Sequence, residues 1–438
     1  MSDLSGALKA RARYMLGFQT NQDLPRSRVL HEFLGVHANN AGDPFVEGDY
    51  GINTKPVERA VLDYFARLWS ADSYWGYVLT LGGSEGTIQA LWSARERLGA
   101  SSSGPEPVLF YSEAAHYSLP KVAGMLKLST FAESGRRDYP GECPLPWSGD
   151  DAEVGWPDAV PVGPDSAVDV DALVRLVGFF VERGHPVILV FNYGATATGA
   201  YDDVAAACRA LRPSLSGSTT SVGENGGAGY WVHVDGAFGA GFMPYVETGY
   251  RQGRSERCGP LFDFRVEEVT SIVCSGHKYL GAPWPCGVYL TRNGGSGASE
   301  PTIVGSPDST LGGSRNALAP VFLWYALARA SEEERVTSAL RCLEVADYAE
   351  RRLRELDEEM LLRDGRGLEV TRPPVSLSVQ FRRPGGGVMD RYALPGFADT
   401  GVSERRRTHL YVLPHVTEGL IDELVEDLRA RGSSAGTE

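Results

Sequence analysis

The chain has 438 residues, which is enough for one large domain and one smaller domain with substantial apolar cores. Its 42 Lys and Arg residues against 56 Asp and Glu residues give a formal net charge of -14, so phosphate backbones and anionic lipid surfaces would be repelled. This balance argues against a nucleic-acid-binding or membrane-binding protein.

Two further features concern the location of the protein. Residues 1–18 lack the basic-then-apolar order of a signal peptide, and no apolar run approaches the about 20 residues that span a bilayer. The six cysteines are scattered with no Cys-x-x-Cys pair, which predicts reduced thiols and neither a disulfide framework nor a metal site. We therefore expect a cytoplasmic protein.

Short β-rich runs alternate with helical patterns over most of the chain. The predicted strands are residues 74–81, 107–112, 186–194, 230–238, 270–274 and 286–292. Helical patterns such as 85–98 and 201–212 lie between them. Continuous apolar strands interleaved with helices predict a mainly parallel sheet covered on both faces, which is α/β organisation. Composition predicts flexible loops at three stretches, residues 136–166, 214–229 and 293–301.

The pattern changes from about residue 320. A helix-rich run at 321–356 leads to strand candidates at 374–381 and 409–415. A final helix places five apolar residues on one face: Leu420, Ile421, Leu424, Val425 and Leu428. We predict an N-terminal arm that packs across a partner subunit, a large domain and a smaller C-terminal α/β domain, with the bounds 1–60, 61–318 and 319–438.

Three chemically distinctive groups each follow a predicted strand. Lys278 lies in "CSGHKYLG", where a buried ammonium group is costly unless it is paired or chemically used. Asp235 ends the strand in "YWVHVDGAF", and a carboxylate at that end points into the ligand crevice of an open α/β sheet. The strand at 74–81 runs into "GGSEGTIQAL", a glycine turn and helix start suited to a phosphate. His116 follows a further strand.

A phosphate site, a carboxylate and a lysine fit pyridoxal 5'-phosphate, which needs a Schiff-base lysine and an acid that keeps its pyridine nitrogen protonated. Taken singly, each feature has a simpler explanation. An Asp-Gly pair usually forms a turn, a glycine pair usually lies in a loop, and a lysine is usually a solvated surface charge. Their occurrence together, each after its own strand, favours the cofactor.

Seven stretches carry a resemblance to a known family: "SGHKYLGAPWPCGVYLTR", "VHVDGAFGA", "GGSEGT", "HANNAGDPF", "EAAHYS", "DSTLGGSRN" and "LYVLPHVT". They resemble the pyridoxal-phosphate-dependent group II amino-acid decarboxylases of the histidine and serine decarboxylase branch, with similarity also to bacterial valine and methionine decarboxylases. The resemblance implies an aspartate-aminotransferase-like (fold type I) enzyme, and a homodimer whose active site lies at the subunit interface.

The resemblance also implies roles for individual residues. Lys278 would form the Schiff base, Asp235 would pair with the pyridine nitrogen, and His116 would stack on the ring opposite Ala237. Thr196 in "NYGATATG" would lie near the phenolic oxygen or the ring. The phosphate would be contacted by four residues: Gly83, Ser84, Ser275 and His277.

The substrate residues are predicted from the same motifs. Arg315 either binds a substrate carboxylate or pins a loop to the dimer partner. Asn40 and Asp43 either line the substrate pocket or form a plain turn, and we favour the pocket because the resemblance is dense there. Leu318 belongs to an Ala-Leu pair where the family resemblance implies Gly-His. His233 and His415 are interpreted as structural histidines.

These features predict a carboxy-lyase that converts a neutral aliphatic L-amino acid of the valine, leucine or methionine type to CO2 and an amine. Alternatives are a histidine or serine decarboxylase, an aldehyde-forming oxidative deaminase on the same scaffold, and a cofactor-holding scaffold without activity. The aldehyde alternative arises because residues 291–321 contain no tyrosine, the usual Cα proton donor of relatives, and Ile303 falls near its place. His116, Lys278 or a residue of the partner chain would then supply the proton.

Overall fold

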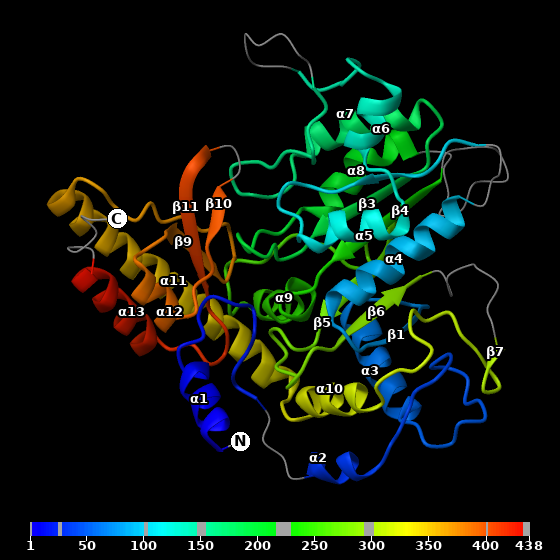
Figure 1. The fold of residues 1–438 in the computed structure, drawn as a ribbon, viewed down its shortest axis with the longest axis horizontal. Coiled ribbons are helices and arrows are strands. Elements are labelled where there is room, and N and C mark those ends of the chain that lie inside the picture. Colours follow the sequence, from blue (N-terminus) through cyan, green and yellow to red (C-terminus); the bar gives the residue numbers. More distant parts are fainter. Residues whose placement is uncertain are drawn as a thin grey trace.

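The computed structural model describes residues 2–24, 29–99, 104–146, 155–215, 229–292, 302–399 and 402–431 (Figure 1). Its strands are β1 (Trp75–Leu79), β2 (Val108–Phe110), β3 (Val187–Asn192), β4 (Tyr230–Asp235), β5 (Val269–Ser275), β6 (Gly287–Thr291), β7 (Thr302–Ile303), β8 (Ser306–Pro307), β9 (Ser378–Arg382), β10 (Phe397–Asp399) and β11 (Val402–Tyr411). Its helices up to residue 251 are α1 (Ser2–Ala12), α2 (Val29–Glu32), η1 (Phe33–Gly35), α3 (Lys55–Leu68), α4 (Gly83–Leu98), α5 (Ser118–Leu126), α6 (Phe131–Asp138), α7 (Val170–Val181), α8 (Val204–Leu215), η2 (Gly239–Gly241) and α9 (Met243–Arg251). The later helices are α10 (Leu318–Ala328), α11 (Glu332–Asp364), α12 (Gly386–Arg391) and α13 (Glu418–Arg431).

The large sheet has six strands in the order β1-β6-β5-β4-β3-β2. Strands β2, β3, β4 and β5 run parallel to one another, whereas β6 runs antiparallel to both β5 and β1. The α/β class and the mainly parallel sheet are thus confirmed, with the last predicted strand reversed. Because β6 runs backwards, β1 ends at the same edge as β3, β4 and β5, and this edge carries the site described below.

Both faces of the large sheet are buried, which explains why the sequences of these strands are continuous hydrophobic runs. Every residue of β1, β3, β5 and β6 is buried. Helix α3 covers the sheet with an apolar stripe that includes Val61, Leu62 and Phe65, all fully buried. Each large side chain of this kind stabilises the fold by about 1.5–3 kcal/mol relative to its exposed state.

The C-terminal part contains the three-stranded sheet β10-β11-β9 with α11, α12 and α13 (Figure 1). The predicted helical run at 321–356 is two helices, because the side chain of Ser331 accepts a hydrogen bond from the backbone of Glu334 and their capping box starts α11 afresh. Strand β11 begins well before the predicted residue 409. The five residues predicted on one face of the last helix are all buried.

The N-terminal segment packs against this small sheet within the same chain. The backbone N–H of Leu16 donates to Tyr392 O (3.2 Å), and that of Tyr411 donates to Leu16 O (2.6 Å). Arg13 pairs with Glu423 on α13, beside which α1 lies in Figure 1. The predicted division at residues 60 and 318 stays a prediction.

The second and third predicted loops fall largely on residues that are not described, whereas most of the first is described. Residues 147–154, 216–228 and 293–301 lie outside the described part of the chain. The first loop was predicted to begin at residue 136, which lies inside α6. Among the described residues, no helix combines the length and apolarity needed to cross a bilayer.

Candidate active site

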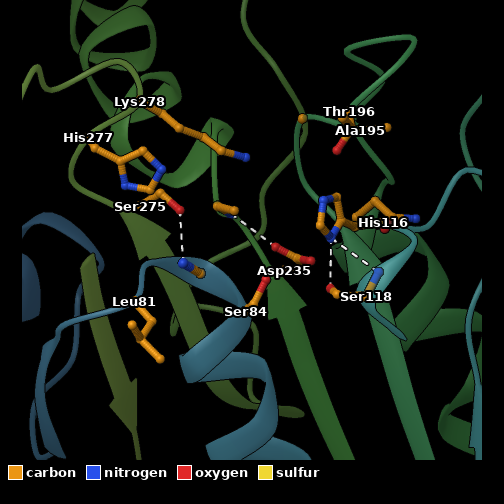
Figure 2. A pocket seen from close by; sticks show the side chains of 14 residues that line it. Leu81, Ser84, His116, Ser118, Ala195, Thr196, Asp235, Ser275, His277 and Lys278 are labelled. Carbon is orange, nitrogen blue, oxygen red and sulfur yellow. Dashed lines mark hydrogen bonds between the residues drawn. The ribbon is translucent and has the colours of Figure 1, made fainter. Parts of the chain in front are cut away.

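A cavity of about 150 Å³ lies at the edge where β1, β3, β4 and β5 end. Its lining comprises Leu81, Gly83, Ser84, His116, Ser118, Asn192, Gly194, Ala195, Thr196, Asp235, Ala237, Ser275, His277 and Lys278 (Figure 2). The structure therefore brings together all nine residues predicted to contact the cofactor. They come from five separate segments of the chain, as expected for a crevice at the carboxyl ends of sheet strands.

The glycine turn between β1 and α4 forms one wall of the cavity. Gly82 has φ 79° and ψ -162°, a conformation open essentially to glycine. A Cβ atom at Gly83 would lie 2.9 Å from the Ala237 side chain. The Gly83 N–H donates to Ser275 Oγ (3.0 Å), which joins the start of α4 to the end of β5. The helix N-terminus beside Ser84 and Ser275 suits a phosphate group.

Asp235 is the last residue of β4, and one of its carboxylate oxygens accepts a hydrogen bond from the Ala237 N–H (3.2 Å). Its strand neighbour in the register is Asn192, the last residue of β3. In Figure 2 Asp235 lies between Lys278 and His116, with its carboxylate at the cavity. A single carboxylate held in this way can pair with a protonated ring nitrogen.

Lys278 lies in the connection by which the chain reverses from β5 into β6. The register places Ser275 opposite Gly287, so the intervening turn is held at the sheet edge. Burial lowers the pKa of the Lys278 ammonium group, and the nearby Asp235 carboxylate opposes this by raising it. The Nζ atom donates to Gln19 Oε1 (2.7 Å), a partner that the sequence did not predict.

His116 stands across the cavity from Lys278 (Figure 2). Its Nδ1 accepts a hydrogen bond from the Ser118 N–H (3.3 Å) and lies 2.7 Å from Ser118 Oγ. Because Nδ1 accepts from the backbone, the ring proton of the neutral histidine belongs on Nε2. Burial lowers the pKa of His116, Asp235 raises it and Lys278 lowers it further. A neutral ring suits stacking on an aromatic cofactor.

The loop after β3 closes a further side of the cavity. The carbonyls of Ala195 and Thr196 both lie 2.8 Å from Tyr411 OH, which ties this loop to the small sheet. Asn192 lines the cavity and donates to Ser112 Oγ (2.9 Å). The motif "NYGATATG" contained Asn192, but only the strand register reveals that it meets Asp235.

The residues predicted to contact the substrate lie elsewhere, outside the residues that line this cavity. Arg315 is 3 % exposed, forms an ion pair with the buried Glu58, and donates to Gly42 O (2.9 Å). Asn40 Nδ2 donates to the same carboxylate of Glu58 (2.8 Å). Within one chain, Arg315 therefore fastens the segment at 302–318 to the loop at 40–43.

The other two predicted substrate residues belong to the same region. Asp43 accepts a hydrogen bond from Trp75 Nε1 (2.8 Å), and Leu318 is the first residue of α10. None of the four predicted substrate residues lines the cavity of its own chain. Their role at the substrate stays a prediction.

The two histidines interpreted as structural have partners within the chain. His415 Nε2 donates to Met15 O (2.9 Å), and its Nδ1 accepts from the Gln22 N–H (3.2 Å). His233 lies two residues before Asp235 in β4, with Nδ1 2.9 Å from Ser271 Oγ. Complete burial lowers the pKa of His233 to about 4, and the charge of Asp235 acts in the opposite direction.

The donor set fits pyridoxal phosphate. A turn that admits no Cβ, the N-terminus of α4 and the hydroxyls of Ser84 and Ser275 suit its phosphate. A carboxylate, an imidazole and a lysine amine face the remaining space in the arrangement that the ring requires.

Comparison with known proteins agrees with this chemistry. Residues 152–300 match the pyridoxal-dependent decarboxylase conserved domain. The chain is 31 % identical to serine decarboxylase 3 of Oryza sativa subsp. japonica over 432 residues, which cover 96 % of this chain and 78 % of that protein. It is 30 % identical to the histidine decarboxylase of Mesorhizobium japonicum over 435 residues, which cover 98 % of this chain and 97 % of the relative.

The structure also resembles that of L-methionine decarboxylase from Streptomyces sp. 590 in its internal aldimine form. The two agree with a TM-score of 0.90 at 34 % sequence identity. The alignment covers 100 % of this chain and 96 % of the other.

We expect Gly82→Ala to weaken pyridoxal phosphate binding by about 10- to 100-fold, because a Cβ atom would strain the backbone by about 1–3 kcal/mol and would lie 2.7 Å from the His277 ring. Titration of the cofactor-free protein, followed by the visible absorbance of the bound cofactor, measures this. Gly124→Ala is the control, since a Cβ atom there meets nothing within 4 Å. Equal affinity of both variants would contradict the role of the turn.

We expect the free energy of unfolding to decrease as the pH falls from about 6.5 towards 4. His233 is neutral in the folded protein over this range, whereas the unfolded chain binds a proton there, so acid favours unfolding. His233→Asn keeps an acceptor for Ser271 and should make this pH dependence shallower. Urea unfolding at a series of pH values measures it, and an identical slope in both proteins would refute the assignment.

Proposed function

The chain belongs to the pyridoxal-dependent decarboxylase family, and we propose that its substrate within that family is a neutral aliphatic L-amino acid of the methionine, valine or leucine type. It is a pyridoxal-phosphate-dependent amino-acid decarboxylase, a carboxy-lyase. The observation that carries the substrate proposal is the likeness to methionine decarboxylase over the whole chain.

One feature of the sequence and one of the structure support an apolar substrate. Ala317 and Leu318 occupy positions at which the family resemblance implies Gly-His, so an apolar side chain stands in place of a polar one. Leu81 lines the cavity and is 72 % exposed, which adds apolar surface at its mouth. Serine or histidine decarboxylation is the alternative, because the relatives with those names are similar over nearly the whole chain.

We assign the chemistry to residues that line the cavity. The bound cofactor supplies an electron sink for the pair left behind when CO2 departs. Asp235 would keep a proton on the ring nitrogen, and Lys278 would supply the amine that bonds the cofactor. His116 and Ala237 would contact the ring, while Gly83, Ser84, Ser275 and His277 would hold the phosphate.

The proton that completes the amine product needs a donor. Residues 302–321 contain no tyrosine, and Ile303, near whose place the family resemblance implies one, lies in β7. Within the cavity, Lys278 carries a proton on Nζ, and neutral His116 carries one on Nε2. We propose that one of these two groups donates to Cα. If neither did, molecular oxygen could take the electron pair and be reduced to peroxide, and water would release an aldehyde and ammonia.

A homodimer in the cytoplasm is part of the same proposal. The chain exposes large apolar side chains between residues 33 and 52, namely Phe33, Leu34, Val36, Phe45, Val46 and Ile52. Tyr117, which follows the cavity residue His116 in the sequence, is 80 % exposed. A second subunit would bury this surface and bring its own residues to the mouth of the cavity. The six free cysteines support a reducing compartment.

We expect CO2 and an amine in equal amounts from methionine, leucine or valine, with kcat/KM about 10- to 200-fold higher than for serine or histidine. The assay supplies each L-amino acid separately and measures CO2, amine, aldehyde and ammonia. Lys278→Ala should lose both the visible cofactor band and turnover.

The other outcomes of this assay are equally informative. A preference for serine or histidine would overturn the aliphatic proposal while leaving decarboxylation intact. Aldehyde with ammonia and peroxide would identify an oxidative reaction. Bound cofactor with no turnover of any amino acid would favour a scaffold without activity.

Light scattering of the purified protein should give the mass of two chains. Leu34→Asp with Ile52→Asp should shift this mass towards that of one chain and lower activity, because two charges would be buried in the interface. Leu362→Asp is the matched control, since Leu362 is 89 % exposed on α11 outside this segment. A wild-type protein with the mass of one chain would contradict the dimer.

A further inference from the structure

The N-terminal arm places one side chain against the cavity lysine. Gln19 is 7 % exposed, and its Oε1 accepts a hydrogen bond from Lys278 Nζ (2.7 Å). Its Nε2 donates to Tyr411 OH (2.8 Å) on the small sheet. One amide group therefore joins the cavity lysine to the C-terminal part of the chain.

The orientation of this amide follows from its neighbours. The carbonyls of Ala195 and Thr196 can only accept, so the Tyr411 hydroxyl group must use its proton towards them. Its oxygen is then an acceptor and takes the N–H of Gln19. The amide oxygen is left facing Lys278, and the reversed amide would place two donors against an ammonium group.

The backbone on both sides of Gln19 is fixed. Gly17 O accepts from His409 Nε2 (3.1 Å), and a side chain at Gly17 would overlap the carbonyl oxygen of Ala393. On the other side, Asn21 Nδ2 donates to Tyr279 O (3.0 Å), the residue that follows Lys278. Rotation of the arm cannot remove the amide oxygen from the lysine without breaking these contacts.

We propose that Gln19 is a positioning residue that holds the side-chain amine of Lys278 at the cavity wall whenever this amine is not bonded to the cofactor. The inference rests on the proposed role of Lys278 as the lysine that bonds pyridoxal phosphate. A fixed acceptor would keep the free amine of Lys278 within reach of the cofactor that it would bond.

The neutrality of Gln19 is part of this role. A carboxylate at the same place would form an ion pair with the ammonium group and raise the pKa of Lys278. The amide accepts a hydrogen bond without adding a charge, so the amine can lose its proton and act as a nucleophile.

The test uses the full-length chain after removal of the cofactor, and measures the labelling of Lys278 by an amine-reactive reagent across a pH series, read by peptide mass spectrometry. Gln19→Glu should raise the apparent pKa of labelling and slow the reaction about tenfold at pH 8. Gln19→Ala should lower the apparent pKa, because the charged amine loses its acceptor. Gln22→Glu, with the same charge change three residues along the arm, should match the wild type.

Opposite shifts in Gln19→Glu and Gln19→Ala would support positioning, since a loss of fold would move both variants in the same direction. Superimposable curves for these variants and the wild type would overturn the proposal. The role of Lys278 is checked separately: a Schiff-base absorption band that persists in Lys278→Ala would refute that role, whatever the labelling shows.

Discussion

The site depends on one topological constraint, the common edge at which β1, β3, β4 and β5 end. Parallel strands deliver their C-terminal residues to the same side of a sheet, and this chain uses that property repeatedly. Asn192, Asp235 and Ser275 each end a strand there. The reversal of β6 completes the arrangement, because it holds the Lys278 turn at the edge and aligns β1 so that the glycine turn opens onto the same space.

The charges at this edge control one another. Lys278 and His116 are both desolvated, which disfavours their charged forms, while Asp235 favours the charged form of each. The single carboxylate of Asp235 therefore acts on both basic groups. The other polar contacts of Lys278 and of the cavity come from neutral groups such as Ser118, Ser275 and Gln19. A site with this charge balance can hold a cationic ring nitrogen without a second buried cation beside it.

Much of the fold and of the candidate site could be predicted from local features of the sequence. The apolar runs, the glycine turn and the short motifs around Asp235 and Lys278 are local, so the strands and the α/β class could be predicted. The nine residues that the family resemblance selected from these motifs all line one cavity, and their contacts with the cofactor stay a prediction. Gln19 and Tyr411 could not, because their importance arises from contacts across 392 residues of sequence. The helix-rich run at 321–356 was predicted without a boundary, and the structure places one at Ser331, whose capping box with Glu334 begins α11. Arg315 shows a further limit: its residue type suits a substrate carboxylate and a buried ion pair equally well, and within the chain it pairs with Glu58.

The contact between Gln19 and Tyr411 has a consequence for the biogenesis of the protein. Loop-closure entropy opposes contacts between such distant residues until the intervening chain has folded. During synthesis the large sheet can form while β11 is still unmade, so the arm stays without its partner until almost the whole chain has emerged. A nascent or C-terminally shortened chain would thus carry the glycine turn, Asp235 and Lys278 around an unfinished cavity. The contact of Gln19 with Lys278 is thus completed only when Tyr411 has joined it.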